Sequence, residues 1–339
     1  MPNDTKRRKD RPSRGSRGEE NRLVSWRHYA GYVLLAFALL LIVLVFFFPK
    51  TGPNYGEPWK EFSGERAFSH VRALVSLGPR PPESDAIKQA RNYIHQQLEA
   101  NGWQVIDQPF SAKTPRGPVR FVNLIARRPD QPDQEKLFFV ASHYDTKTFD
   151  LIRFVGANDG GSGSGALIEL GRVLNQHPEL AARVELIFFD GEEAYSQFTK
   201  TDGLYGSRFF ANKARQAKRA QYYRGGIVWD MIGDRNLTIT LPFDSPSELA
   251  SGIFAAADAL KVRDHFTFYR DMVLDDHTPL NEVGIPTIDL IDFDYPPWHT
   301  VGDTMDKLSP ESLRIVGQVT AYYLARSAFL DASSVRNDR

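Results

Sequence analysis

The sequence predicts one α/β domain preceded by a single transmembrane helix. Apolar runs of strand length alternate with segments of helical period from about Trp59 to the end of the chain. Several of the runs are continuously apolar, as strands are when both faces of a parallel sheet are covered. A separate run of twenty residues without a charge occupies residues 29–48. No internal repeat or long low-complexity linker interrupts the alternation, so we expect a single folded domain over residues 55–331.

The composition excludes several classes of protein and of site. The chain has 339 residues with 42 Lys and Arg against 42 Asp and Glu, and this balance argues against nucleic-acid binding by the whole chain. The sequence contains no cysteine, which excludes disulfides, thiolate metal ligands and thiol nucleophiles. Any metal must therefore be bound by His, Asp and Glu.

The N-terminal segment has the pattern of a membrane anchor. Residues 1–28 carry nine basic and four acidic side chains and are expected to form a disordered arm. Residues 29–48 are long enough as a helix to cross about 30 Å of hydrocarbon, and the basic flank predicts a cytoplasmic arm with the domain outside the cytoplasm. The alternatives are a core helix, a cleaved signal peptide, which would end in small residues, and a nucleic-acid role for the arm.

Seven segments are predicted as strands and five as helices within the folded domain. The strands are 103–107, 119–126, 137–142, 184–189, 226–230, 237–241 and 287–291, and the helices are 85–100, 164–174, 206–219, 247–260 and 310–330. In open sheets of this kind, ligands bind beyond the carboxyl ends of the strands. We therefore expect the chemistry to lie at these ends.

Ionisable residues follow several of the predicted strands. They are His143, Asp159, the pair Glu192 and Glu193, Asp230 and His299. Zinc binds imidazole nitrogen and carboxylate oxygen together, and a catalytic site keeps one position open beside three protein ligands. Asp159, Glu193 and His299 fit that need. Each residue taken alone has an ordinary alternative as a helix cap, a turn former or a hydrogen-bonded surface residue.

The adjacent pair Glu192 and Glu193 indicates two distinct roles. Two neighbouring carboxylates repel each other unless a cation or a shared proton relieves the repulsion. Because consecutive residues point in different directions, one Glu can bind a metal while the other faces the reacting group as general acid or base.

The order and spacing of these residues resemble peptidase family M28, the zinc aminopeptidases, over about residues 60–330. Several segments are more similar to the animal-type glutaminyl-peptide cyclotransferases of that family than to its peptidases. They are residues 141–147, 188–195, 204–208, 230–233, 275–277 with Pro279, and 298–300. Residues 156–162 and 299–308 resemble the peptidases instead.

The resemblance implies a three-layer domain, with a mostly parallel mixed sheet and helices on both faces. It also implies that Asp159, Glu193 and His299 hold one Zn²⁺ while Glu192 moves the proton, with Asp230 and Asp275 as nearby carboxylates that set its pKa. In the two-zinc aminopeptidases, the residues that match His143 and Asp230 bind a second ion, and the loop Asp bridges the two metals. The resemblance is therefore compatible with either one or two zinc ions at the site.

Three aromatic residues are expected to bind substrate by the same resemblance. Trp298 precedes the predicted ligand His, as in the cyclases, and Phe198 stands where the cyclases carry a pocket Trp. Tyr295 or Phe293 would supply a further pocket aromatic. Packing in the core is the alternative for aromatic residues in general.

The function implied is conversion of the N-terminal glutamine of peptides or proteins to pyroglutamate with release of ammonia. An aminopeptidase that hydrolyses N-terminal residues is the alternative. A third reading, an inactive peptide-binding domain at the outer membrane face, is disfavoured because every inferred ligand is present. The expected partners are peptide and protein N-termini and, through residues 29–48, the lipid bilayer; no nucleic acid is expected.

Overall fold

The computed structural model describes residues 32–35, 37, 55–131 and 136–329. The described residues 55–131 and 136–329 belong to one compact unit. The predicted arm at 1–28 lies outside the described residues, and of the predicted membrane helix only residues 32–35 and 37 are described, as helix. None of the described helices combines the length and the apolar character that crossing a bilayer needs.

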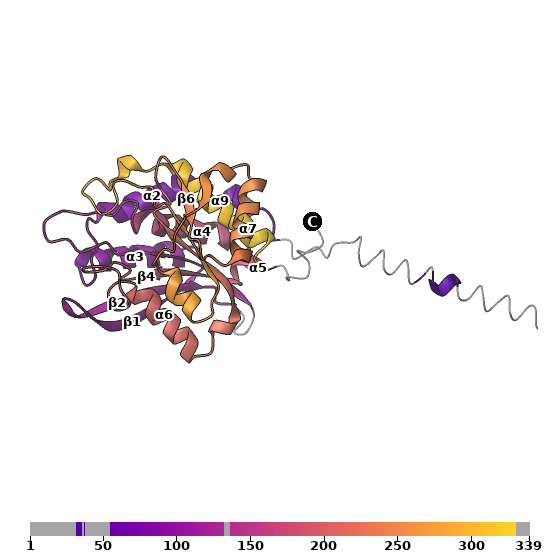
Figure 1. Ribbon diagram of the computed structural model, residues 1–339, viewed down its shortest axis with the longest axis horizontal. Coiled ribbons are helices and arrows are strands. Elements are labelled where there is room, and N and C mark those ends of the chain that lie inside the picture. The colour runs from indigo at the N-terminus through magenta and orange to yellow at the C-terminus, as the bar shows by residue number, and fades with distance from the viewer. Residues whose placement is uncertain (1–31, 36, 38–54, 132–135, 330–339) are drawn as a thin grey trace, which may run out of the picture. The chain divides into compact units, whose positions relative to one another are not determined.

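An eight-stranded mixed sheet forms the centre of the domain (Figure 1). The strands are β1 (Gln104–Thr114), β2 (Gly117–Arg127), β3 (Leu137–His143), β4 (Val184–Phe189), β5 (Tyr223–Asp230), β6 (Ile239–Leu241), β7 (Phe266–Phe268) and β8 (Thr287–Ile291). They lie in the order β1-β2-β4-β3-β5-β8-β6-β7. The central strands β4, β3, β5 and β8 are parallel, whereas β1, β2 and β4 pair antiparallel, as do β8 and β6.

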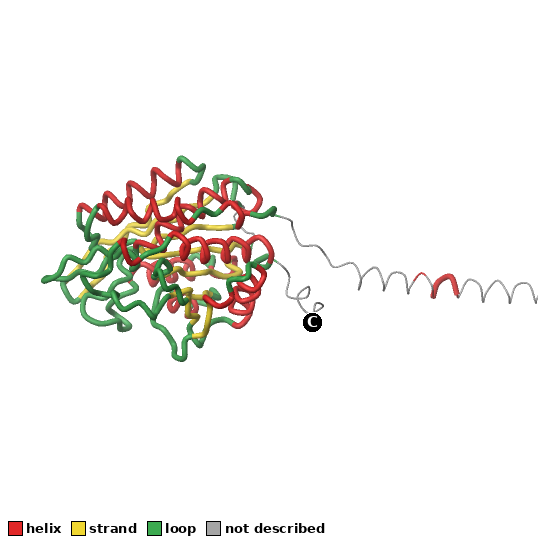
Figure 2. Tube along the Cα trace, turned by 90° about the horizontal axis from the view of Figure 1, so that it is seen from above, coloured by secondary structure: helices red, strands yellow, loops and turns green. Residues whose placement is uncertain are grey.

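Helices pack on both faces of the sheet (Figure 2). The α-helices are α2 (Gly64–Ser76), α3 (Asp85–Glu99), α4 (Gly161–Asn175), α5 (Pro178–Ala181), α6 (Tyr205–Gln216), α7 (Ser247–Ala259), α8 (His277–Glu282) and α9 (Pro310–Arg326). Alternate residues of β3 belong to opposite layers: Phe138 is part of the core cluster that includes residues of α2, α3, α4, α7 and α9, whereas Phe139 is part of the cluster that includes residues of α6 and α8. The expected three-layer arrangement is therefore present.

The predicted elements agree best where apolar runs are short and bounded by polar residues. The bounds of β4 and β8 are those predicted. The prediction at 103–107 was too short because β1 continues to Thr114 as the outer strand of a hairpin, where half-exposed polar residues hide the strand pattern. Helix α2 was missed, although Ser63 caps it by accepting a hydrogen bond from the Arg66 N–H at 3.3 Å. The edge strand β7 was also missed, since three residues give no measurable alternation.

Candidate metal centre

The three predicted zinc ligands lie together beyond the carboxyl ends of the parallel strands. Asp159 is in the loop before α4, Glu193 follows β4, and His299 lies in the segment after β8. The Nε2 atom of His299 is 3.3 Å from Asp159 Oδ2 and 3.2 Å from Glu193 Oε2. One ligand atom from each residue lies within 4.8 Å of the other two. The structure thus brings together three side chains that are far apart in the sequence.

The carboxylates of this group suit a cation. Asp159 and Glu193 are 2% and 5% exposed, and Oδ2 of Asp159 and Oε1 of Glu193 accept no hydrogen bond from the described residues. Two buried carboxylates that face one imidazole are unfavourable without further positive charge, so a positive ion between these oxygens and the His299 ring would satisfy them. The oxygen and nitrogen donors are those of a zinc site without cysteine.

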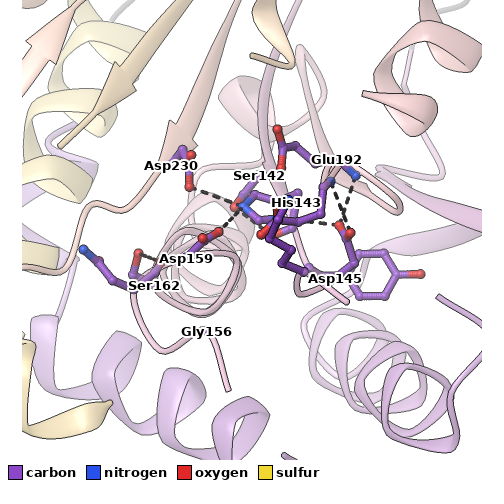
Figure 3. Close-up of polar contacts among 12 residues, drawn as sticks. Ser142, His143, Asp145, Gly156, Asp159, Ser162, Glu192 and Asp230 are labelled. Atoms are coloured by element: carbon purple, nitrogen blue, oxygen red, sulfur yellow. Dashed lines mark hydrogen bonds and ion pairs between the residues drawn. The ribbon is translucent and has the colours of Figure 1, made fainter. Parts of the chain in front are cut away.

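His143 and Asp230 form a second group that shares Asp159 (Figure 3). The Nε2 atom of His143 lies 3.2 Å from Asp159 Oδ1 and 3.3 Å from Asp230 Oδ1. Asp159 therefore directs one oxygen toward each imidazole, which is the arrangement that a bridging ligand needs. The residues expected to hold a second ion in a two-zinc enzyme are thus in place beside the first group.

The electrostatics of both groups are dominated by closely spaced imidazoles and carboxylates. Burial lowers the pKa of His299, but the carboxylates of Asp159 and Glu193 raise it to about 9. Burial raises the pKa of Asp159, and the two imidazoles outweigh this and hold that pKa below its ordinary value. In the absence of metal, protons on the rings balance the acids, and metal binding would release them.

Glu192 is buried beside the predicted ligands and does not belong to either group of ligand atoms. Removal from water raises the pKa of its carboxyl, and the neighbouring acids Asp275, Glu193 and Asp276 raise it further. Asp230 also has a raised pKa, about 7, mainly because of burial. A carboxyl with a raised pKa can accept a proton near neutral pH and release it again, as general acid–base catalysis requires.

Asp145 holds the turn that carries the two glutamates, a role that the sequence did not reveal. Its Oδ1 accepts the N–H of Glu192 at 3.2 Å, and its Oδ2 accepts the N–H of Glu193 at 3.4 Å. Figure 3 shows Asp145 beside Glu192. The same carboxylate lies 3.4 Å from Nδ1 of His143. Asp145 therefore orients His143 and both glutamates at once.

Two further side chains fix the loop that presents Asp159, and neither was predicted. The fully buried Arg80 donates to the carbonyl oxygens of Val155 at 2.8 Å and Gly156 at 3.0 Å. Asp303 accepts the N–H groups of Asn158 at 2.8 Å and Asp159 at 3.1 Å. Together they hold both ends of a short loop whose conformation places the Asp159 carboxylate.

A glycine next to Asp159 is required by the same loop. Gly160 has φ of +74°, and a Cβ there would lie 2.4 Å from the carbonyl oxygen of Asp145. Both the left-handed backbone and the lack of space favour glycine at this position. The close approach of the Asp159 loop to the end of β3 depends on it.

A cavity of about 290 Å³ opens onto the predicted ligands and Glu192. Its lining also includes Asp230 and Asp275 and the aromatic side chains of Phe198, Phe293 and Trp298. The Trp298 ring stacks on His299 with 4.1 Å between ring centroids and remains 40% exposed. The predicted metal ligands and the acidic side chains thus share one small cavity with aromatic side chains, as is typical of pockets for small groups.

The expectation that Tyr295 binds substrate was wrong. Tyr295 is 4% exposed, packs with Met231 and Ile291, and donates its hydroxyl to Asp303 at 2.7 Å. It is not among the residues that line the cavity, whereas Phe293 is. Tyr295 supports the Asp159 loop through Asp303, and Phe293 takes the position at the cavity.

Comparison with known proteins agrees with this site. The family model for peptidase family M28 matches residues 123–324. The glutaminyl-peptide cyclotransferase-like protein of Bos taurus is 30% identical over 275 residues, which cover 73% of this chain and 71% of that protein. A glutaminyl cyclase from an Acidobacteriales bacterium has a TM-score of 0.72 and 32% identity over 78% of this chain and 94% of its own.

A peptidase structure is also similar. The Zn-dependent exopeptidase from Parabacteroides distasonis has a TM-score of 0.71 and 26% identity, over 78% of this chain and 98% of its own. A cyclase and an exopeptidase are therefore both similar to this chain in fold. From the family model and the sequence identity together, the chain belongs to peptidase family M28 and, within it, to the glutaminyl-peptide cyclotransferases.

Proposed function

We propose that this protein is a zinc-dependent glutaminyl-peptide cyclotransferase that converts the N-terminal glutamine of peptides to pyroglutamate. The observation that carries the proposal is one cavity in which Glu192 lies beside Asp159, Glu193 and His299 and faces aromatic walls. The relatives named as glutaminyl-peptide cyclotransferases support the cyclase over the peptidase.

Different residues of the cavity would bind the metal and hold the substrate. Zinc held by Asp159, Glu193 and His299 would act as a Lewis acid toward the side-chain amide of the substrate. The aromatic rings of Trp298, Phe198 and Phe293 would pack against the methylene groups of the glutamine and keep water out of the small cavity. This packing would keep the glutamine folded back on itself, with its own amine near its side-chain carbonyl.

Glu192 would move the proton. The α-amine nitrogen forms a bond to Cδ of the same residue and gives up a proton to the Glu192 carboxylate. The bond between Cδ and the side-chain nitrogen then breaks, and Glu192 returns the proton to that nitrogen, which leaves as ammonia. Asp230 and Asp275 line the same cavity, and the negative charge of Asp275 helps to keep the pKa of Glu192 raised.

We propose one zinc for this reaction, held at the Asp159, Glu193 and His299 site. The aminopeptidase remains the second candidate function because His143 and Asp230 could bind a second ion together with Asp159. Asp159 also belongs to the group with Glu193 and His299. In that case Glu192 would take a proton from water rather than from the substrate amine.

A pair of fluorogenic substrates separates the two functions. We expect the purified protein to release ammonia from a glutaminyl aminocoumarin amide while the bond to the dye stays intact, and to leave the alanyl amide unchanged. A chelator should abolish the activity and added zinc should restore it. Free dye from either substrate would instead support the aminopeptidase.

We also propose that residues 29–48 anchor the protein in a membrane, with the arm at 1–28 in the cytoplasm and the catalytic domain outside it. The support is the uncharged twenty-residue run and its basic flank. In cells that express the full chain, the protein should stay with the membrane fraction after an alkaline carbonate wash. Recovery in the wash would argue against the anchor.

A further inference from the structure

The cavity at the metal centre opens to solvent over apolar side chains that the proposed reaction does not use. The acids Glu192, Glu193 and Asp275 line the cavity and are at most 5% exposed. By contrast, Met272 is 74% exposed and Leu274 is 44% exposed, and both line the same cavity. The change in exposure places the acids at the floor of the cavity and the two apolar side chains at its opening.

The segment between β7 and α8 holds Met272 and Leu274 in this position. Val273, which separates them, is buried, so its two neighbours lie on the outer side of the segment. The backbone before Met272 is hydrogen-bonded to the end of β6 and to the loop after it, through the N–H of Tyr269 at 2.7 Å and the carbonyl oxygen of Asp271 at 3.2 Å. These bonds fix the backbone that presents the apolar side chains.

A row of aromatic rings connects the metal centre with the opening. The Trp298 ring, which stacks on His299, has its centroid 5.9 Å from that of Phe293. The Phe293 centroid is in turn 5.2 Å from that of Tyr269. Phe293 and Tyr269 both line the cavity, as Met272 does. An apolar surface therefore runs from the predicted ligand His299 to the outermost side chains of the opening.

The charges around the cavity disfavour a further carboxylate at the opening. None of the described residues that line the cavity is Lys or Arg, and Asp271 adds an exposed carboxylate there. Arg270 approaches Asp271 to 3.2 Å, but its side chain is 87% exposed and does not line the cavity. A substrate carboxylate at the opening would lose water against apolar side chains and gain no cationic partner from the lining.

The size of the cavity determines which part of a peptide reaches the opening. Its volume of about 290 Å³ is at the lower end of the range for small-ligand pockets, about 300–1,000 Å³, which leaves room for one residue. With the glutamine at the floor, the peptide chain leaves through the opening, where its second side chain meets Met272 and Leu274. Contiguous exposed apolar side chains beside a binding cavity are typical of a surface that a ligand covers.

We propose that Met272 and Leu274, together with the exposed edge of Phe293, select peptides whose second residue is apolar and discriminate against those whose second residue is acidic. The inference rests on the function proposed above, because it takes glutamine as the residue at the floor of the cavity. One apolar group in an apolar pocket commonly changes kcat/KM by about 10–200-fold, and a half-open site belongs at the lower end of that range.

The test compares kcat/KM for ammonia release from glutaminyl peptides that differ only in the second residue, which is Phe, Leu, Gly or Glu. For the purified full-length protein with zinc, we expect the phenylalanyl and leucyl peptides to exceed the glycyl peptide by about tenfold. The glutamyl peptide should fall below the glycyl peptide. The second side chain makes the same contact in the ground state and in the transition state, so the differences should appear in KM rather than in kcat.

Substitutions at the opening assign the preference to its residues. Met272→Ser and Leu274→Ser should each lower kcat/KM for the phenylalanyl peptide several-fold and leave the glycyl peptide unchanged, which also shows that the catalytic site is intact. Met272→Lys should raise kcat/KM for the glutamyl peptide about tenfold, because it places a cation beside the substrate carboxylate. The control is Leu151→Ser, since Leu151 is 97% exposed and does not line the cavity. It should keep the wild-type preference.

Equal kcat/KM for the phenylalanyl, glycyl and glutamyl peptides would overturn the proposal and leave the cyclase function standing. A preference for Phe that persists unchanged in Met272→Ser and Leu274→Ser would overturn the assignment to these residues. Absence of ammonia release from every glutaminyl peptide would contradict the proposed function itself, and the inference with it.

Discussion

Replacing Glu192 by Gln is expected to lower kcat at least about a hundredfold, which is the usual scale for loss of an acid–base group. Gln has the size of Glu but cannot accept the amine proton. Because Glu192 is not one of the proposed ligands, zinc content should stay at the wild-type level, and KM should change little. The measurement is ammonia release from a glutaminyl peptide, combined with zinc analysis of the same sample.

The matched control is Glu179→Gln, since Glu179 is an exposed residue of α5. This variant should keep wild-type turnover. Near-normal turnover by Glu192→Gln would remove Glu192 from the proton transfer. Parallel loss of zinc and activity would show instead that Glu192 is a metal ligand.

Replacing His299 by Ala is expected to weaken zinc binding by more than about a hundredfold and to abolish activity together with the metal. Of the three proposed ligands, His299 alone supplies nitrogen, and its Nε2 atom is within 3.3 Å of both carboxylates. The measurement is titration with a competing chelator, followed by an activity assay in excess zinc.

His95→Ala serves as the control, because His95 lies on α3 and bonds Asp107 rather than the site. Its zinc affinity should match that of wild type. An unchanged zinc affinity in His299→Ala would exclude His299 from the ligands and would leave the group around His143 as the metal site.

The sequence predicted the parts of the site that follow from local pattern. The strands β4 and β8 are short apolar runs, and the polar residues after them stand out because the change in character is abrupt. The pair Glu192 and Glu193 was recognisable because adjacent carboxylates after a buried strand repel each other unless a cation or a shared proton relieves the repulsion. Parallel strands end at one edge of the sheet, which is why residues so far apart in the chain could be expected to meet.

The supports of the site could not be predicted in this way. Arg80 binds carbonyl oxygens 75 and 76 residues away, and Asp303 binds backbone N–H groups 144 and 145 residues away. Neither contact leaves a local pattern, because any backbone group can be the acceptor or donor. The sequence also could not show that Phe293 rather than Tyr295 lines the cavity, because the turn after β8 decides which aromatic side chain faces it.

The most direct test of the zinc site is a crystal structure of the zinc-loaded protein with anomalous diffraction recorded at the zinc edge. We expect an anomalous peak about 2.0–2.2 Å from a carboxylate oxygen of Asp159, one of Glu193 and the Nε2 atom of His299. Zinc bound elsewhere, with no peak among these three side chains, would contradict it.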